Sequence, residues 1–535
     1  MVPASRRLLP PSHPPRHPRG HARRRPGPLC QPRHRRHHRR RRPRRERRQP
    51  RRPLPAPPRL TPRCRHATPR RPLLRHHGTL PAPRRVGPYR AHRRAPLPRR
   101  PPRPRLPGAR VTSTLIRNAR VVTAPAAGRR GPDAVATSLG LCDVRLEHGV
   151  IASVTTHDAR RRFTSVEGFS VTNAQGERTE LHDPPPAHAD HTIDAAGRVL
   201  IPGFVDCHTH ACWAGSRLDE WEQRLRGASY LDILRAGGGI MSTVRAVRAA
   251  SRRDLADSTR DRLSRFLDAG TTTIEIKSGY GLTTADELKM LGAITDAAAS
   301  WPGTVVPTAL LGHAIDPDQP DFVRRTIRET LPAVHAEFPG IPIDLYLESG
   351  AWSLDHARAL LEAALALQHP IRLHADQFSS MGGIPLAIAL GARSVDHLEA
   401  STLPDLRALA ASDVTGVILP VCGVHAEGSF ADARTLLDAG GLLAIATNCN
   451  PGSAPTESMP LALAIAVRRC RVTPAEAIAA ATSGAANVLR LPDRGRISPG
   501  LRADLCLLDT TDERDLAFRL ASNLVRTVWC AGVAR

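Results

Sequence analysis

The sequence predicts an α/β fold: a (β/α)8 barrel of the TIM type, with a small composite β-sandwich domain built from both chain ends. Across the middle of the chain, short apolar strands alternate with helical stretches. This alternation is typical of a parallel sheet, and about eight such units close a barrel. Strand-like, turn-rich sequence precedes and follows this region, so we expect the two flanking parts to pair beside the barrel.

These patterns divide the chain into four parts. A basic extension covers residues 1–110, and the N-terminal part of the β-sandwich domain covers residues 111–197. The barrel covers residues 198–488, and the C-terminal part of the β-sandwich domain covers residues 489–535. The polar stretch 160–190 contains three consecutive prolines and is interpreted as an inserted loop.

The basic extension dominates the charge of the chain. Residues 1–110 contain 36 Arg, no Lys and one acidic residue, Glu46, for a net charge of +35. Because this segment cannot bury an apolar core, it is predicted to be disordered. We interpret it as upstream DNA translated before a true start near Val111, as a solvated tail, or as an arm that binds nucleic acid by charge alone.

The rest of the chain has the composition of an ordinary, slightly acidic soluble protein. Its 425 residues carry 42 basic and 48 acidic side chains, so we expect no nucleic-acid binding by the folded body. The ten cysteines form no CxxC pair, and no apolar run reaches the ~18–20 residues that span a membrane. We therefore expect reduced thiols, a cytoplasmic location and no membrane partner, and we leave a homodimer open.

Eight apolar segments are expected to form the barrel. The first ends directly before His208, and the others are 272–276, 305–311, 343–347, 371–373, 393–395, 415–419 and 442–446. A long helical region, 218–270, follows the first strand and is broken by three glycines. Later helical segments are 286–299, 322–337, 354–368, 383–390, 403–411 and 430–439.

Two histidines one residue apart, His208 and His210, close the first barrel strand. Side chains at positions i and i+2 of an extended chain point to the same side, so both imidazoles project together from the strand end. Divalent metals such as zinc bind convergent imidazoles. Two ordinary polar residues closing a strand would give the same short pattern, so its meaning depends on the remaining strand ends.

Those strand ends carry further polar residues. Barrel enzymes place their chemistry at the C-terminal ends of the strands, where side chains from different strands meet. Here the ends carry Lys277, Tyr280, His313, Glu348, His374, His397, Asn448 and Asn450. Histidines at the ends of strands one, three, five and six are expected to converge on one pocket.

This arrangement resembles the metal-dependent amidohydrolase superfamily, and within it the imidazolonepropionase family. The resemblance extends over nearly all residues from Val111 to the C-terminus. Matching segments include Glu275-Ile-Lys-Ser-Gly-Tyr-Gly281, Leu373-His-Ala-Asp-Gln377, Asp396-His-Leu-Glu399 and Asn450-Pro-Gly-Ser453. The Lys-Ser-Gly-Tyr-Gly and Asn-Pro-Gly parts are far more specific than the HxH pattern.

The resemblance implies one zinc or iron ion per subunit, held by His208, His210, His374 and the side chain at position 448. It also implies hydrolysis of the ring amide of 4-imidazolone-5-propanoate to N-formimidoyl-L-glutamate, in histidine degradation. The family has Asp at the fourth ligand position, whereas this chain has Asn448. An amide oxygen is a weak ligand and no useful base at neutral pH, so another group accepts the proton, or activity is low or absent.

The resemblance also implies roles for other residues. His397 would stabilise charge or carry a proton, Gln377 would hydrogen-bond the ring, and Arg217 would clamp the propionate. Independently of the resemblance, Glu348 after the fourth strand is interpreted first as a residue that supports the metal ligands and second as a proton acceptor. Substrate contacts are implied for Tyr280, His313, Asn450, Gly452 and Ser453.

Two further interpretations concern charged and polar residues near these positions. Glu275 and Lys277 share one face of a strand, and we interpret them as an internal ion pair that orients Tyr280. His425 and Glu427 do not match the family pattern and are interpreted as solvated loop residues.

Two other functions remain open from the sequence. Another single-metal amidohydrolase, such as a deaminase of a nucleobase-like ring, would need the same barrel and the same ligands. A catalytically inactive homologue kept as a binding protein would explain Asn448.

Overall fold

The computed structural model describes residues 113–157, 170–172, 178–180, 189–228, 232–233, 237–425 and 428–535. The basic extension and the start near Val111 lie outside the described residues, as does Glu427. The predictions made for these positions therefore stay predictions.

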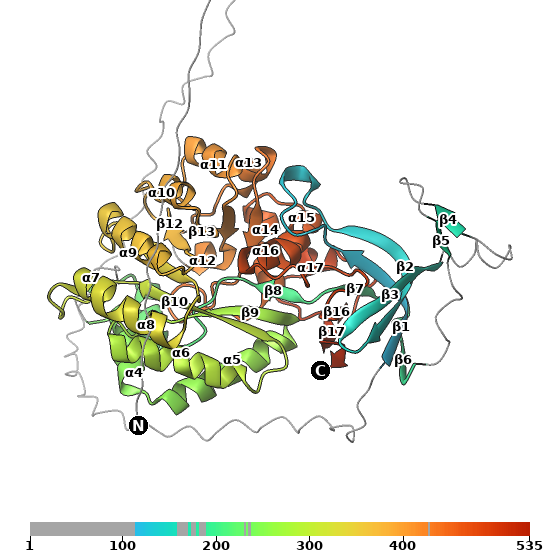
Figure 1. The fold of residues 1–535 in the computed structure, drawn as a ribbon, viewed down its shortest axis with the longest axis horizontal. Helices are drawn as coiled ribbons and strands as arrows, with labels where there is room; N and C mark the ends of the chain where they lie inside the picture. Colours follow the sequence, from blue (N-terminus) through green and yellow to red (C-terminus); the bar gives the residue numbers. More distant parts are fainter. Residues whose placement is uncertain are drawn as a thin grey trace, which may run out of the picture. The chain divides into compact units, whose positions relative to one another are not determined.

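Eight strands in the order β15-β14-β13-β12-β11-β10-β9-β8 form a parallel barrel, which confirms the predicted fold class (Figure 1). Each pair of neighbours in this order is parallel. The strands are β8 (Phe204–Asp206), β9 (Thr271–Lys277), β10 (Thr304–Gly312), β11 (Ile343–Leu347), β12 (Leu373–Ala375), β13 (Ser394–His397), β14 (Thr415–Ile418) and β15 (Leu443–Ile445).

Polar contacts join the two ends of this strand order. The hydroxyl of Thr447, just past β15, donates to Asp206 Oδ2 on β8 at 2.5 Å. The backbone N–H of Asn448 donates to His208 O at 3.1 Å, and that of His210 donates to Cys449 O at 2.9 Å. The first and last barrel strands therefore meet at the residues proposed as ligands.

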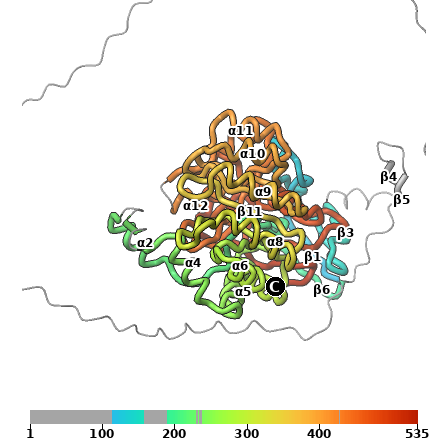
Figure 2. The backbone as a smooth tube through the Cα atoms, turned by 60° about the vertical axis from the view of Figure 1, so that its left-hand side comes forward, coloured from blue at the N-terminus to red at the C-terminus, as the bar shows by residue number. Residues whose placement is uncertain are grey.

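Helices surround the barrel (Figures 1 and 2). The helices between barrel strands are α2 (Leu218–Leu225), α4 (Ile240–Ala249), α5 (Arg252–Asp268), α6 (Thr284–Ala298), α7 (Phe322–Arg325), α8 (Leu331–Glu337), α9 (Leu354–Ala366), α10 (Gly383–Leu390), α11 (Leu403–Ala410), α12 (Pro420–His425) and α13 (Ala433–Asp438). Those after β15 are α14 (Met459–Arg469), α15 (Pro474–Ala479), α16 (Ala485–Leu489) and α17 (Asp515–Phe518). Wider π-type turns, Thr326–Thr330 and Ala480–Gly484, connect α7 to α8 and α15 to α16.

Local sequence explains why these elements form where they do. Every residue of β9 is buried, as expected for a parallel strand covered on both faces. Helix α5 begins with a capping box in which Ser251 accepts from Asp254 N and the Asp254 side chain accepts from Ser251 N. Thr283 caps α6 in a similar way by accepting from Asp286 N.

A second sheet flanks the barrel and contains strands from both chain ends. Its order is β18-β17-β16-β7-β1-β2-β3, with β6 beside β1. These strands are β1 (Ser113–Thr123), β2 (Thr137–Glu147), β3 (Val150–Thr156), β6 (His191–Asp194), β7 (Val199–Pro202), β16 (Leu505–Leu508), β17 (Val525–Cys530) and β18 (Val533–Ala534), and a short 3-10 helix, Gly131–Asp133, precedes β2. The C-terminal strand β16 pairs antiparallel with β7, so the predicted pairing of the two ends is confirmed.

Strands β4 (Ser170–Thr172) and β5 (Arg178–Glu180) form a separate antiparallel pair within the segment interpreted as an inserted loop. The eight cysteines among the described residues are free and buried. Within the same part of the chain, no helix is both long enough and apolar enough to cross a membrane.

Candidate active site and metal centre

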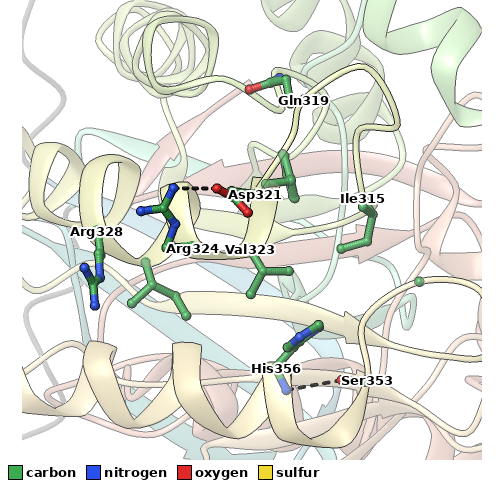
Figure 3. Close-up of a pocket in the computed structure, with 11 residues that line it drawn as sticks. Ile315, Gln319, Asp321, Val323, Arg324, Arg328, Ser353 and His356 are labelled. Carbon is green, nitrogen blue, oxygen red and sulfur yellow. Dashed lines mark hydrogen bonds and ion pairs between the residues drawn. The ribbon is translucent and has the colours of Figure 1, made fainter.

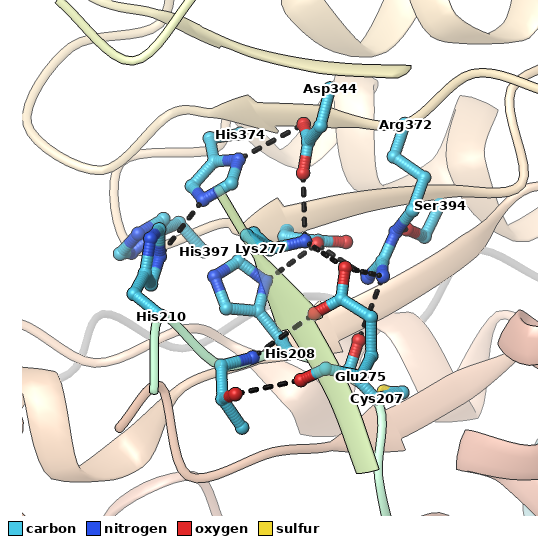
Figure 4. A network of polar contacts seen from close by, with 12 residues as sticks. Cys207, His208, His210, Glu275, Lys277, Asp344, Arg372, His374, Ser394 and His397 are labelled. Atoms are coloured by element: carbon cyan, nitrogen blue, oxygen red, sulfur yellow. Dashed lines mark hydrogen bonds and ion pairs between the residues drawn. The ribbon is translucent and has the colours of Figure 1, made fainter. Parts of the chain in front are cut away.

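Three histidines converge at the C-terminal end of the barrel (Figure 4). His208 and His210 follow β8, and His374 lies on β12. One ligand atom from each of these buried residues lies within 4.8 Å of the others. The Nε2 atoms of His210 and His374 are 3.4 Å apart, close to the roughly 3.3 Å between nitrogens around a tetrahedral ion. The predicted convergence of these imidazoles is therefore present.

Two buried carboxylates orient two of the imidazoles. Asp396 Oδ2 lies 2.6 Å from His208 Nδ1, and Asp344 Oδ1 lies 3.1 Å from His374 Nδ1. A proton held on Nδ1 leaves Nε2 free to bind a metal. A hydrogen bond from Nδ1–H to a carboxylate is the usual second contact of a metal-binding histidine. Sequence analysis did not assign either carboxylate to the site.

Burial keeps these imidazoles neutral, as a metal requires. It lowers the pKa of His208 and His210 well below the ordinary value, and the neighbouring imidazoles lower it further. Burial also lowers the pKa of His374, although Asp344 opposes that effect. Metal ions bind neutral imidazole, so these groups need to release no proton near pH 7.

Two buried candidate ligand atoms here have no hydrogen-bond partner within the described part of the chain: His208 Nε2 and Asn448 Oδ1. A buried polar atom without a partner costs about 1–3 kcal/mol, and native proteins rarely leave two side by side. A divalent cation would satisfy such lone pairs. The residues present therefore fit a metal ion.

A buried ionic network lies beside the three histidines (Figure 4). Lys277 Nζ lies 2.8 Å from Asp344 and 2.7 Å from Glu275. Arg372 lies 3.0 Å from Glu275 and 2.7 Å from Asp396. Burial by itself raises the pKa of Asp344, but His374, Lys277 and Arg372 outweigh it and hold that pKa well below its ordinary value. The network thus keeps Asp344, the carboxylate that orients His374, ionised.

The predicted ion pair between Glu275 and Lys277 is present, but its predicted role is wrong. Its contacts run to Asp344 and Arg372 under the histidines. The loop that carries Tyr280 is held instead by Glu287. This buried carboxylate accepts hydrogen bonds from the backbone N–H groups of Gly279, Gly281 and Leu282 at 2.8–2.9 Å.

We expect Glu287→Gln to loosen this loop. A glutamine offers one acceptor oxygen and directs an NH2 group at backbone N–H donors. The free energy of unfolding should fall by about 1–3 kcal/mol, the cost of buried donors left unpaired. Thermal unfolding of the purified variant measures the loss. Glu329→Gln, an exposed change on a neighbouring helix, is the control and should leave stability within about 0.5 kcal/mol. Equal stabilities would contradict the role of Glu287.

Tyr280 and His313 line the side of the centre next to His210. The His313 ring stacks on the His210 ring with centroids 4.9 Å apart, and Tyr280 lies 4.9 Å from His313. Burial lowers the pKa of His313 to about 3, and its Nδ1 lies 3.0 Å from Gly279 O. Burial raises the pKa of Tyr280 above its ordinary value, so the phenol stays protonated.

The loop after β15 places three more of the expected residues together. Asn450 Oδ1 accepts from the backbone N–H groups of Gly452 and Ser453, both at 2.8 Å, and Asn450 Nδ2 donates to Asn448 O at 2.7 Å. Asn448 has a φ of +56°, in the left-handed region that Asn and Asp tolerate better than most residues.

Arg217 lies beside this loop. A Cβ placed on Gly452 would be 3.4 Å from Arg217 Nη1, so the guanidinium is adjacent to the backbone there. Arg217 Nη2 forms a 2.6 Å ion pair with Glu220, while Nε is buried without a hydrogen-bond partner within the described part of the chain. The guanidinium therefore has donor capacity left for an anionic group.

His397 and Gln377 complete the opposite side. The His397 ring lies 5.7 Å from the His374 ring and 6.1 Å from the His208 ring. His397 has a φ of +95°, a strained backbone conformation for a side chain of this size. Gln377 Nε2 lies 3.4 Å from Cys422 Sγ.

Glu348 does not join the histidines. Its oxygens accept from the backbone N–H groups of Ser349, Phe378 and Ser379, and from the Ser379 hydroxyl. The carboxylate thus holds the loop that follows Gln377, and its lone pairs are already engaged.

Comparison with known proteins adds family membership to this geometry. Residues 199–535 match the model of the amidohydrolase family. The chain is 48% identical over 353 residues to the imidazolonepropionase of Herpetosiphon aurantiacus, covering 64% of this chain and 83% of that protein. It is 44% identical to the imidazolonepropionase of Deinococcus radiodurans, covering 64% and 86%. The chain belongs to the imidazolonepropionase family of amidohydrolases.

Solved structures share the fold of this family at lower identity. The 5-methylcytosine deaminase from Klebsiella pneumoniae, liganded with phosphonocytosine, has a TM-score of 0.57 and 16% identity, covering 78% of this chain and 97% of its own. The atrazine chlorohydrolase from Arthrobacter aurescens TC1, complexed with zinc, has a TM-score of 0.55 and 18% identity, covering 79% and 94%.

Besides Asp344 and Asp396, sequence analysis missed Cys422, whose sulfur lies beside Gln377. His425 and Glu427 were interpreted as solvated loop residues, but the stretch that contains His425 forms helix α12 and buries Cys422. His425 is partly buried at the end of α12, and its carbonyl accepts from Arg224. Burial raises the pKa of the Cys422 thiol to about 12. Cys422 gave no local signal, because it stands four residues past the end of β14 among apolar residues.

A hollow of about 790 Å³ lies apart from the histidines (Figure 3). Residues of α7, the Thr326–Thr330 turn and the start of α9 line it, including Arg324, Arg328 and His356. None of the family's expected site residues borders this hollow. The candidate site is therefore the histidine centre.

Proposed function

We propose that this chain hydrolyses the ring amide of 4-imidazolone-5-propanoate to N-formimidoyl-L-glutamate, with one zinc or iron ion per subunit. The observation that carries the proposal is the juxtaposition of a three-histidine centre with a free guanidinium nitrogen of Arg217 beside the Asn450–Ser453 loop. At such a site a metal ion could act on the ring amide, and the Arg217 guanidinium could bind the carboxylate of the propionate. Family membership supports the same substrate.

His208, His210 and His374 would hold the ion, with Asn448 as a weak fourth contact. A bound zinc ion lowers the pKa of water toward about 7, which makes hydroxide available at neutral pH. Asp396 and Asp344 keep the imidazoles oriented for this task.

The other residues would position the substrate. Arg217 would bind the propionate through paired N–H donors, a strong and directional contact. The Asn450 loop would contact the substrate beside it, and Tyr280 and His313 would cover the ring. Gln377 would donate its amide N–H to a ring atom.

A proton released during attack on the amide needs an acceptor other than Asn448. His397 is favoured over Glu348, because the lone pairs of Glu348 already accept backbone and hydroxyl hydrogens. His397 Nδ1 lies 3.2 Å from Glu399 Oε1. A proton held on Nδ1 toward this carboxylate leaves Nε2 of His397 free to accept another.

Turnover by the purified protein tests the proposal directly. The chain is loaded with zinc or iron, supplied with 4-imidazolone-5-propanoate and assayed for N-formimidoyl-L-glutamate. Product formation that a chelator abolishes would support the proposal. A correctly folded, metal-loaded chain that forms no product would contradict it and favour the inactive homologue.

Arg217→Gln separates this function from deamination of a neutral ring. Losing a charge-assisted pair costs about 1.5–3 kcal/mol, so KM should rise roughly 10–100-fold while kcat changes less. The control is Arg226→Gln, which removes an exposed ion pair with Glu222 at the C-terminal end of helix α2. Arg217 precedes the first residue of this helix, and the control should leave KM unchanged. Turnover of a neutral cyclic substrate with no loss in the Arg217 variant would favour a deaminase.

We also propose a cytoplasmic location and no nucleic-acid or membrane partner for the folded body. A homodimer is the assembly we would test first, by analytical ultracentrifugation of the full chain.

A further inference from the structure

Glu220 lies on helix α2 and contacts the guanidinium that is proposed to bind the propionate. Its Oε2 atom lies 2.6 Å from Arg217 Nη2, and the side chains of Arg217 and Glu220 are only 16% and 14% exposed. Salt and water weaken an ion pair much less when it is partly withdrawn from solvent. The contact is therefore suited to keep the guanidinium in one position.

The same carboxylate oxygen is also bound by a backbone donor at the start of helix α4. Gly239, which directly precedes this helix, donates its N–H to Glu220 Oε2 at 3.1 Å. Its φ of +75° lies in the left-handed region that favours glycine. The N-terminal end of a helix attracts negative charge, which adds to this contact. Glu220 is thus tied to a helix whose Val244 and Val247 are buried in the core.

Gly238 leaves the space that this carboxylate occupies. A Cβ placed on Gly238 would lie 3.0 Å from Glu220 Cδ and 2.6 Å from Ile233 Cγ2. Both distances are shorter than the roughly 3.5–4.0 Å of an ordinary contact between carbon atoms, so a side chain there would displace the carboxylate. Two of the three glycines that break the helical region after β8, Gly238 and Gly239, therefore accommodate Glu220.

Helix α4 also contacts Arg217 directly. Arg217 Nη1 donates to the hydroxyl of the buried Thr243 at 3.4 Å. The guanidinium is therefore held by α4 directly at Nη1 and through Glu220 at Nη2. A long side chain that is already held in place loses less conformational freedom when a ligand binds to it.

Helix α2 itself adds little to the protein core, since none of its residues, Leu218–Leu225, is buried. The contacts of Glu220 with Arg217 and Gly239 therefore serve the position of the guanidinium more than the packing of the core. Replacing Glu220 is expected to change what Arg217 binds without unfolding the barrel.

We propose that Glu220 is a positioning residue that gives the site its selectivity for substrates with a carboxylate. By holding Arg217 Nη2 toward α4, it fixes the direction in which the guanidinium presents its remaining donors beside the Asn450–Ser453 loop. This inference rests on the proposed function, in which Arg217 binds the propionate. Without Glu220, Arg217 would remain charged but would have to be ordered by the substrate itself.

Binding of two probes to the zinc-loaded full chain tests this proposal without any turnover. The first probe, 3-(imidazol-4-yl)propanoate, carries the carboxylate, and the second, 4-propylimidazole, is a neutral match. Calorimetry gives Kd for each probe in the natural chain, in Glu220→Gln, in Arg217→Gln and in the double variant. The matched control is Glu222→Gln, an exposed change on the same helix that removes only the ion pair with Arg226.

Glu220→Gln is expected to raise Kd for the carboxylate probe by about 3–10-fold, the cost of ordering one long side chain. Kd for the neutral probe should stay unchanged, and Glu222→Gln should alter neither value. In the Arg217→Gln background, Glu220→Gln should cause no further loss, because two residues that act through one contact are not additive. Thermal unfolding of Glu220→Gln should match that of Glu222→Gln.

Three outcomes would overturn the proposal. They are an equal loss for both probes, a full additional loss in the double variant, and tighter binding of the carboxylate probe by Glu220→Gln. The last would mean that Glu220 competes with the ligand for Arg217. If Glu220→Gln fails to fold by circular dichroism, Glu220→Asp replaces it. Its shorter carboxylate cannot reach both Arg217 and Gly239, so the same selective loss is expected.

The natural chain separates this inference from the proposed function. If the natural chain binds both probes equally well, Arg217 does not hold the carboxylate, and the proposed function and this inference fail together. If the natural chain prefers the carboxylate probe and Glu220→Gln keeps the whole preference, only this inference fails.

Discussion

Asn448→Asp is expected to raise kcat for the proposed hydrolysis at neutral pH by at most about 10²–10⁴-fold, the full contribution of a positioned proton acceptor, because His397 already serves as an acceptor in the natural chain. Asn448 Oδ1 is buried beside the three histidines without a hydrogen-bond partner within the described part of the chain. A carboxylate in its place would both bind the metal and accept a proton, whereas an amide does neither well. The backbone φ of +56° is one that Asp also adopts.

Initial rates at saturating substrate, with metal content measured in parallel, check this expectation. Asn448→Ala is the control, because it removes the amide without supplying a base and should show no gain. If Asn448→Asp loads metal fully and turns over no faster than the natural chain, another group already accepts the proton, and His397 becomes the residue to replace next.

Lys277→Met is expected to lower the free energy of unfolding by about 3–5 kcal/mol, because it leaves buried carboxylates without their cation. Lys277 is completely buried between Glu275 and Asp344. Since Asp344 orients His374, metal affinity should also fall, by about 10–100-fold. Urea denaturation and metal titration measure the two effects.

Lys289→Met is a matched control for this variant. Lys289 also pairs with a carboxylate, Asp286 at 2.8 Å, but it is partly exposed. Its loss should cost about 1 kcal/mol or less and leave metal affinity unchanged. Equal losses of stability in the two lysine variants would show that the buried network does not support the metal centre.

The barrel could be predicted from sequence because its strands are short, apolar and regularly separated by helices. The segment 343–347 was predicted with the boundaries of β11, while 371–373 was displaced by two residues from β12. The single helix predicted over 322–337 is interrupted by a π-type turn. Hydrophobic pattern locates elements well but fixes their ends and internal irregularities poorly.

The three histidines were predictable because HxH and strand-end positions have local signatures. The residues that orient them were not. Asp344 and Arg372 each stand alone among apolar residues of a strand, and their partners come from other strands. Such pairing depends on which strands become neighbours. The available signal for these residues was a charged side chain inside an otherwise apolar strand. Cys422 is uncharged and gave no signal of this kind.

The contact between Asp206 and Thr447 has a consequence for how the protein matures. These residues are 241 positions apart. Proposed ligands of the cation follow each of them: His208 and His210 follow Asp206, and Asn448 follows Thr447. A nascent chain on the ribosome can present His208 and His210 early, but their partners emerge only after most of the barrel has been synthesised. Cofactor capture is therefore expected to be one of the last events of maturation, and a chain released before residue 448 should leave the ribosome without its ion.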